Sequence, residues 1–199
     1  MKIRHVFALA ALLVGVEVSS ATVLDFENLS EGHHLSDAPY GGITWGTSTD
    51  DSFNGSVGSF VASKITAGYA MASSGTTYLY NAWGVNRLSF TFDSGPTTFN
   101  GAYFAQVQGP LAWSIATKIR FSDDLGDQSS WLNLTEAPQY LSANFVGATT
   151  IYVEHDGGGP NEYTMDDVRF AEPVPEPEML PALGVGVFAV CRRRRAPRN

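Results

Sequence analysis

Four acidic residues in the central sequence have the chemistry that a calcium site needs. Asp25 and Glu27 come early in the chain, and Asp166 and Asp167 come late. Calcium takes about six to eight oxygen ligands, which carboxylates and backbone carbonyls supply. If the first and last strands pair, these acids meet at one sheet edge, where a cation relieves their repulsion. Neighbouring strand residues point to opposite faces, so we expect only one of Asp166 and Asp167 to contribute its side chain. The alternative is that all four acids are exposed to solvent.

A second acidic segment, residues 123–127 (Asp-Asp-Leu-Gly-Asp), has the composition of a calcium loop but not the spacing of an EF-hand. Asp and Gly are also the residues that a hairpin turn needs. We therefore predict a turn at this segment rather than a metal site.

Aromatic residues give the sequence a second kind of binding chemistry, the recognition of sugars. The chain contains four tryptophans and eight tyrosines. Aromatic rings stack on the C–H face of a sugar, while nearby Asn, Asp or Gln groups bond its hydroxyls. The predicted glycan-binding surface consists of Tyr78, Tyr80 and Trp83, with Asn81 beside them. Aromatic residues are also ordinary core residues of a β-sandwich, so core packing is the alternative at each position.

The sequence offers little that supports catalysis. The central part has neither a cysteine nucleophile nor a Gly-x-Ser-x-Gly elbow. Its histidines, His33, His34 and His155, lack the His-x-x-x-His spacing of a zinc site. A carboxylate pair for glycoside hydrolysis stays open as an alternative, because such a pair is recognised by its separation in space. We therefore expect a protein that is not an enzyme.

The elements that must position these residues are strands. Strand patterns recur at short intervals between Gly, Asn, Asp and Ser turns, and no sustained helical period interrupts them. Residues 88–93 alternate cleanly, and a second apolar face is expected from Ile115 to Phe121, opposed by Lys118 and Arg120. Strands buried on one side belong to antiparallel sheets, so about ten of them predict an all-β, antiparallel two-sheet β-sandwich of the jelly-roll type. The predicted strands are 22–28, 42–46, 59–63, 77–82, 86–93, 98–107, 112–122, 130–134, 149–155 and 163–170.

Charged residues are distributed very unevenly along the chain. Seven of the twelve Lys and Arg residues lie in the two end segments, which leaves five between residues 22 and 172. Seventeen acidic residues stand against those five, so this central part carries a net charge of −12. Such an acidic surface repels nucleic acid and anionic lipid, and it suits cations or neutral sugars. We therefore expect no nucleic-acid partner.

The first 21 residues have the layout of a secretory signal peptide. A basic stretch at residues 2–5 precedes an apolar run at 6–16, and small residues at 19–21 form a cleavage site. The alternative is a buried N-terminal helix. The single cysteine, Cys191, lies near the other end of the chain, so the central domain cannot contain a disulfide.

The C-terminal sequence has three ordered parts. From Pro173 the chain reads Pro-Val-Pro-Glu-Pro-Glu, followed by thirteen mostly apolar residues, Met179 to Cys191, and by four arginines. The prolines keep the first part extended, and the apolar part is long enough only for a short transmembrane helix. The arginines hold the end of that helix on the cytoplasmic side. This pattern indicates a tail anchor with the domain outside the membrane.

These three parts resemble the PEP-CTERM sorting signal of Gram-negative bacteria. In that family an inner-membrane exosortase recognises the tail, cleaves it near Pro-Glu-Pro and passes the body of the protein to the cell surface or matrix. The resemblance implies that Pro175, Glu176 and Pro177 are the recognised motif. It also implies that a cluster of arginines retains the tail, namely Arg192, Arg193, Arg194 and Arg195. Export of this type is associated with exopolysaccharide production. The alternative is an uncleaved tail anchor.

The central region resembles the jelly-roll, galactose-binding-like domains of exported surface proteins. It opens with residues 24–27 (Leu-Asp-Phe-Glu), continues with residues 40–45 (Tyr-Gly-Gly-Ile-Thr-Trp) and closes with residues 165–170 (Met-Asp-Asp-Val-Arg-Phe). The resemblance implies that the first and last strands lie close together and share a structural Ca²⁺ ion.

The sequence thus predicts a signal peptide at 1–21, a β-sandwich domain at 22–172 and a sorting signal at 173–199. The predicted function is that of an exported, non-enzymatic surface or matrix protein, structural or adhesive in an exopolysaccharide matrix. A calcium-dependent carbohydrate-binding module is the first alternative, and a glycan-active hydrolase is the less favoured one. The expected partners are an exosortase-like membrane protease and extracellular polysaccharide. The expected location is the cell surface or matrix of a Gram-negative bacterium, after transient insertion in the inner membrane.

Overall fold

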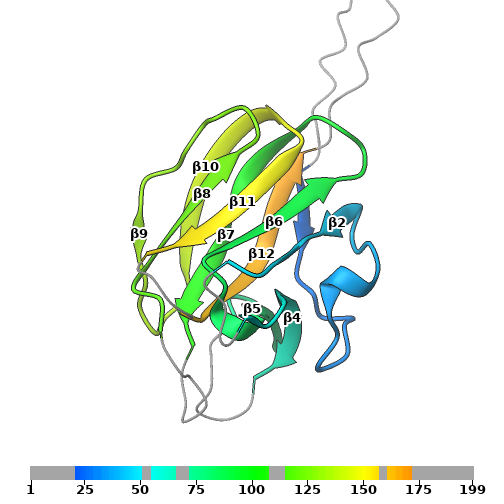
Figure 1. Ribbon diagram of the computed structural model, residues 1–199. Helices are drawn as coiled ribbons and strands as arrows, with labels where there is room; N and C mark the ends of the chain where they lie inside the picture. The colour runs from blue at the N-terminus through cyan, green and yellow to red at the C-terminus, as the bar shows by residue number, and fades with distance from the viewer. Residues whose placement is uncertain (1–20, 51–54, 66–71, 108–114, 157–160, 172–199) are drawn as a thin grey trace, which may run out of the picture. The chain divides into compact units, whose positions relative to one another are not determined.

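The computed structural model describes residues 21–50, 55–65, 72–107, 115–156 and 161–171 (Figure 1). All of them belong to one compact unit, Ser20–Pro173. The first twenty residues, the Pro-Glu-Pro motif, the apolar tail and the arginine cluster lie outside the described residues. Within the described ranges, no helix has both the length and the apolar character needed to cross a membrane.

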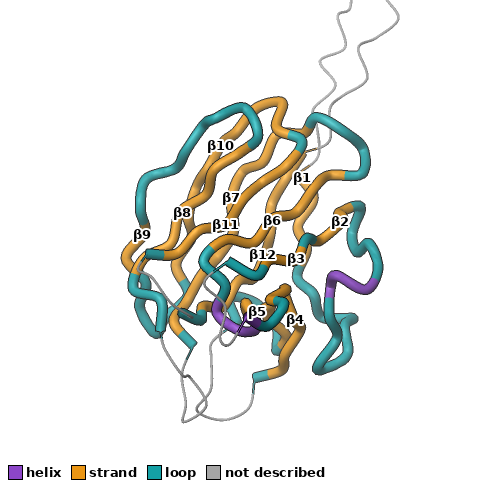
Figure 2. Tube along the Cα trace, viewed as in Figure 1, coloured by secondary structure: helices purple, strands orange, loops and turns teal. Residues whose placement is uncertain are grey.

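The strands form two sheets, and every strand pair in them is antiparallel (Figures 1 and 2). The predicted two-sheet antiparallel sandwich is therefore confirmed. The seven-stranded sheet has the order β10 (Gln139–Ala148), β7 (Thr97–Gln106), β12 (Tyr163–Ala171), β5 (Thr77–Asn81), β4 (Gly58–Lys64) and β3 (Thr47–Ser48), with β1 (Ala21–Leu24) paired to β12. The five-stranded sheet has the order β2 (Ile43–Trp45), β6 (Arg87–Phe92), β11 (Thr150–His155), β8 (Lys118–Asp123) and β9 (Leu132–Asn133).

Aromatic side chains fill the space between the sheets. Phe99 on β7 is fully buried, and its ring centroid lies 4.7 Å from that of Phe121 and 5.6 Å from that of Phe90, both on the other sheet. Trp45 and Phe60 make a similar contact at 5.6 Å between β2 and β4. Edge-to-face contacts of this kind add to the large apolar area that each ring buries. The core of the domain therefore lies between the two sheets.

The first and last strands pair, as the jelly-roll resemblance implies. β1 pairs with the second half of β12, from Leu24 opposite Val168 to Ala21 opposite Ala171. β5 pairs with the first half of β12 through Thr164 and Met165. Residues 166 and 167 lie between these two paired stretches, where β12 also has a bulge relative to β7.

Several parts of the strand prediction were wrong. The predicted strand 22–28 ends at Leu24, since Phe26 has a positive φ (58°), and the short strand β3 was not predicted. β10 was not predicted, because Asn144 (φ 54°) and Gly147 (φ 78°) interrupt its alternation with register shifts. The predicted strand 112–122 starts only at Lys118, and Ile115 is 41% exposed rather than on the buried face. Ile115 instead forms a parallel bridge with Glu162, outside the sheet ladder. Two short 3-10 helices, η1 (Leu35–Asp37) and η3 (Ala82–Gly84), complete the described elements that concern the sites below.

Candidate functional site

The carboxylates of Asp166 and Asp167 bind the same short segment. Asp166 Oδ2 accepts hydrogen bonds from the backbone N–H groups of Ser73 (2.8 Å) and Ser74 (3.1 Å) and from the Ser73 hydroxyl (3.0 Å). Asp167 accepts the hydroxyls of Ser73 and Ser74, each at 2.8 Å. The premise that these two side chains point to opposite faces was wrong, because the bulge and the positive φ of Asp167 (46°) turn both toward one loop. How many of them would bind calcium stays a prediction.

Glu27 holds the next residues of that segment. Its carboxylate accepts the N–H of Thr76 at 2.7 Å, the N–H of Thr77 at 2.6 Å and the Thr76 hydroxyl at 3.2 Å. Burial acts to raise the pKa of Glu27, but the hydrogen bonds from Thr77 and Thr76 outweigh it and lower the pKa below its usual value. Asp25 stands apart, since it accepts the N–H of Glu27 at 3.3 Å in a local turn.

Three of the four predicted calcium ligands therefore contact residues 73–77, where β5 begins. Among the residues that the structure describes, no three His, Cys, Asp or Glu side chains form a group that could hold a metal ion. Burial raises the pKa of Asp166 to about 6, against the hydrogen bonds from Ser74 and Asp167. The three carboxylates hold the segment that leads into β5 by hydrogen bonds, and calcium binding stays a prediction.

The second acidic segment forms the predicted turn. Asp123 Oδ1 accepts the N–H groups of Leu125 (3.0 Å) and Asp127 (2.8 Å), which closes an Asx turn. Gly126 has a φ of 96°, a conformation that glycine adopts at little cost.

The structure separates the three aromatic residues of the predicted glycan surface. Tyr78 is 5% exposed and Tyr80 is half-buried, and both lie on the outer face of β5, opposite to the core residue Leu79. Trp83 is 47% exposed and lies in η3, with a φ of 67°. Tyr78 therefore offers little ring surface to a ligand, whereas Trp83 is open to solvent.

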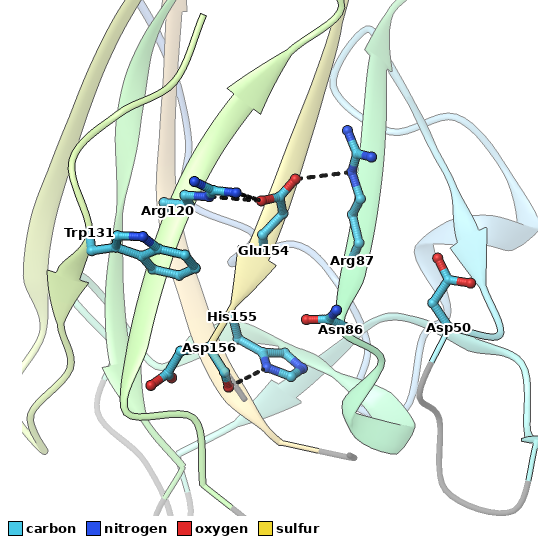
Figure 3. A pocket seen from close by; sticks show the side chains of 8 residues that line it. All are labelled: Asp50, Asn86, Arg87, Arg120, Trp131, Glu154, His155 and Asp156. Carbon is cyan, nitrogen blue, oxygen red and sulfur yellow. Dashed lines mark hydrogen bonds and ion pairs between the residues drawn. The ribbon is translucent and has the colours of Figure 1, made fainter. Parts of the chain in front are cut away.

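A row of charged residues crosses the outer face of the five-stranded sheet instead. Glu154 on β11 is opposite Arg87 on β6 and Arg120 on β8. Its Oε2 atom accepts Arg120 Nε at 2.8 Å and lies 2.7 Å from Arg120 Nη2, while its Oε1 atom lies 3.3 Å from Arg87 Nε. The strand register thus makes one carboxylate the brace of two guanidinium groups, as Figure 3 shows.

Aromatic rings back both guanidinium groups. Arg120 Cζ lies 4.6 Å from the ring centroid of Trp131, and Arg87 Cζ lies 3.7 Å from that of Tyr152. Trp131 itself is 43% exposed. Cation–π stacking of this kind fixes the plane of an arginine and leaves its N–H groups directed sideways.

Both arginines, Glu154 and Trp131 line a pocket with a volume of about 500 Å³ (Figure 3). A volume of this size is within the range of small-ligand sites. The residues that line it are Asp50, Asn86, Arg87, Arg120, Trp131, Glu154, His155 and Asp156.

Two further residues shape one end of the pocket. His155 is buried, and its ring nitrogens lie 3.0 Å from the carbonyl oxygen of Asp156 and 3.2 Å from that of Gly84. The Asp156 carboxylate accepts the N–H groups of Thr117 (3.1 Å) and Lys118 (2.7 Å). Burial acts to raise the pKa of Asp156, but these bonds, together with that of the Thr117 hydroxyl, lower it. His155 and Asp156 therefore tie β11 to its neighbours with their polar groups already bonded.

Two of the three carboxylates that line the pocket have fixed partners. Glu154 is bonded to two arginines, and Asp156 accepts backbone N–H groups. A general acid or base needs a group that is free to exchange its proton at the reacting atom. Fixed donors and acceptors beside a half-exposed indole ring are what sugar hydroxyls and a sugar ring require.

Comparison with known proteins identifies the end of the chain. Residues 173–195 match the PEP-CTERM protein-sorting motif. No curated protein matches the sequence significantly.

Among solved structures, two variants of a family 29 carbohydrate-binding module align at a TM-score of 0.44 and 8% identity. The alignments cover 77% of this chain and 93% and 92% of those chains. The C-terminal family 22 carbohydrate-binding module of Clostridium thermocellum Xyn10B aligns at a TM-score of 0.37 and 13% identity, over 70% of this chain and 92% of that one.

The motif match confirms the resemblance that the tail sequence shows. The signal implies export, processing by an exosortase and delivery to the cell surface from a membrane-anchored intermediate. The chain thus carries a C-terminal PEP-CTERM protein-sorting motif, which marks it as an exported protein of the exosortase system.

Proposed function

We propose that this protein is a non-enzymatic surface or matrix protein that adheres to extracellular polysaccharide through the pocket on its five-stranded sheet. One observation carries the proposal: Trp131 is 43% exposed beside arginine and carboxylate groups that are already fixed in position. Groups held before the ligand arrives lose little entropy on binding. The sorting signal supports the location, because it delivers the domain to the side of the membrane where polysaccharide is.

The charge of the pocket favours an uncharged sugar. Asp50, Glu154 and Asp156 stand against Arg87 and Arg120, so the formal charge of the lining is close to zero. Hydroxyl groups both donate and accept, and the mixed lining supplies partners of both kinds. The proposed ligand is therefore a neutral stretch of a glycan chain.

Two tryptophans give a matched test of the site. The protein, purified from its host after export, is run in gels that contain the polysaccharide of the host's own matrix. We expect Trp131→Ala to weaken the affinity that the retardation measures about 10-fold or more. The sugar ring loses its stacking surface, and Arg120 loses the indole ring that fixes its plane. Trp83→Ala removes an equally exposed indole outside the pocket and is expected to bind like the parent protein. Equal binding by the parent and Trp131→Ala proteins would exclude the pocket, and loss in Trp83→Ala alone would favour η3 instead.

Glu154→Gln tests, in the same assay, whether binding needs the ion pairs that Glu154 makes with Arg87 and Arg120. The substitution keeps the shape of the side chain but removes the charge that holds Arg87 and Arg120 together. We expect glycan binding to weaken and the melting temperature to fall moderately, since the change leaves two partly buried arginines without a counter-charge while the protein still folds. Release of reducing sugar ends from the same polysaccharide would contradict the non-enzymatic proposal.

Calcium dependence is a separate part of the proposal, and it relies on Asp166 and Asp167, whose carboxylates both accept the Ser73 hydroxyl. A cation there would hold the start of β5 in place of the serine donors. Repeating the gels and the thermal melts with Ca²⁺ and with a chelator tests this part. A calcium requirement that Asp167→Asn abolishes would support it, whereas identical melts in both conditions would remove calcium from the proposal.

A further inference from the structure

The outer face of the seven-stranded sheet holds an arginine between two tyrosines. Tyr103 on β7 is directly opposite Tyr140 on β10, and their ring centroids are 5.2 Å apart. Arg169 on β12 is opposite Gly101, and its Cζ atom lies 5.4 Å from the ring of Tyr103 and 5.3 Å from that of Tyr140. All three side chains are half-buried. Their neighbours Phe104, Leu141 and Phe170 point into the core, so these three point outward.

Arg169 differs from the arginines of the pocket because no carboxylate of the described residues forms an ion pair with it. Both ion pairs found in the described part of the chain involve Glu154, on the opposite sheet. The nearest acids along β12 are Asp166 and Asp167, whose oxygens are bonded to Ser73 and Ser74. A cation that is partly withdrawn from water without a counter-charge is costly, and an anionic ligand relieves that cost.

The same guanidinium lacks an acceptor at one of its donors. Its Nε atom is buried and has no hydrogen-bond partner among the described residues. Aromatic faces attract the charge of a guanidinium but accept none of its in-plane hydrogen bonds. The cluster therefore presents a guanidinium with an unsatisfied donor between two aromatic rings on one sheet face.

We propose that Arg169, Tyr103 and Tyr140 form a second binding site, which takes the carboxylate of an acidic sugar within a glycan chain. A carboxylate matches the two parallel N–H groups of a guanidinium. The tyrosine rings, which are half-buried on the same face, receive the sugar ring.

The net charge of the domain selects among acidic ligands. A charge of −12 repels a dense polyanion at long range, whereas contacts within the site act below the screening length of about 8 Å at physiological salt. An isolated carboxylate on a mostly neutral chain therefore fits better than nucleic acid or a highly charged polymer. With the pocket on the other sheet, the domain can join two glycan chains.

Two oligosaccharides that differ only in the carboxylate test the proposal. One is a neutral oligosaccharide that carries a single glucuronic acid residue, and the other is the same molecule with its carboxyl group reduced. Calorimetry with the purified exported protein is expected to show binding of the acidic form about 10-fold tighter. Equal affinity for both forms, or no binding of the acidic form, would overturn the proposal.

Variants locate the binding and separate it from the pocket. Arg169→Gln is expected to remove the preference for the carboxylate, and Arg169→Lys to keep only part of it, because lysine lacks the planar fork. Tyr140→Ala, on the edge strand β10, provides a second test if the arginine variants fail to fold. Trp131→Ala is expected to keep the preference. If Trp131→Ala abolishes it and the Arg169 variants do not, the acidic sugar binds in the pocket and the second site is wrong.

Discussion

At the scale of single residues, a carboxyl group has a different role and a different pKa according to the groups that surround it. Glu154 lies between two arginines and fixes them, whereas Asp166 is buried among serine and backbone donors. Glu162 has neither arrangement, and burial raises its pKa to about 7. A carboxyl group whose pKa is raised holds its proton more tightly in the folded than in the unfolded protein.

We expect these two raised pKa values to make the protein less stable as the pH rises. Asp166 lowers the free energy of unfolding as the pH rises from 3.8, its unperturbed pKa, to about 6. Glu162 does so as the pH rises from 4.5 to about 7. Over those windows the folded state binds more protons, so the free energy of unfolding falls with pH. The loss is on the order of 3 kcal/mol at most for Asp166, and it is smaller for the half-buried Glu162, which water screens. The pKa values of Glu27 and Asp156 are lowered, so these two groups stabilise the fold near neutral pH and lose that contribution only as the pH falls.

Urea unfolding between pH 4.5 and 8 measures this dependence. Glu162→Gln and Asp166→Asn are each expected to flatten the decline in their own window, and comparison with the parent protein cancels the contribution of the histidines. A decline that is identical in all three proteins would show that other groups cause it.

At the scale of elements, the sequence predicts strands better than it predicts their partners. Alternation identified β6 and β11 because both keep a strict inward and outward order. It missed β10, whose bulges break that order, and it treated Asp166 and Asp167 as ordinary strand neighbours. The pocket could not be predicted, because Arg87, Arg120 and Glu154 are distant in sequence and meet only through the register of three strands. Each of them nevertheless lies at an outward position of a predicted strand. A charged residue at such a position is the sequence pattern that could have identified these pocket residues.

Gly101 controls how closely β10 approaches β7. It has a φ of 140°, and a Cβ atom there would lie 2.1 Å from the carbonyl oxygen of Leu141 and 3.0 Å from the hydroxyl of Tyr140. We expect Gly101→Ala to lower the free energy of unfolding by about 2–4 kcal/mol, because backbone atoms must move apart.

The matched control is Gly95→Ala, where φ is also positive (88°) but nothing lies within 4 Å of the added atom. That change is expected to cost only about 1 kcal/mol, the price of the backbone conformation. Urea unfolding compares the two variants, and equal losses would show that the contact with β10 is not what requires glycine.

At the scale of the whole molecule, the basic residues gather at the two ends of the chain and the acidic residues between them. Seven basic residues lie in the two ends, which contain the predicted signal peptide and the sorting motif, and the part between them has a net charge of −12. An acidic domain is soluble outside the cell and is repelled by anionic lipid surfaces. Its few arginines are placed on the outer faces of the two sheets, where the proposed sugar contacts lie. The composition therefore fits a protein that leaves the membrane and keeps its binding groups for glycans.

This route predicts a defined mass for the protein outside the cell. We expect the extracellular form to begin at Thr22 and to end near Pro175–Pro177, before any glycan is added. Glu176→Ala alters the recognised motif, so the full tail is expected to stay in the inner membrane, whereas Glu178→Ala lies just beyond it and is expected to be processed normally. Intact-mass measurement of membrane and extracellular fractions distinguishes these forms. A parent protein found only with its full tail in the membrane would contradict release, and the glycan partners would then be sought on the periplasmic side.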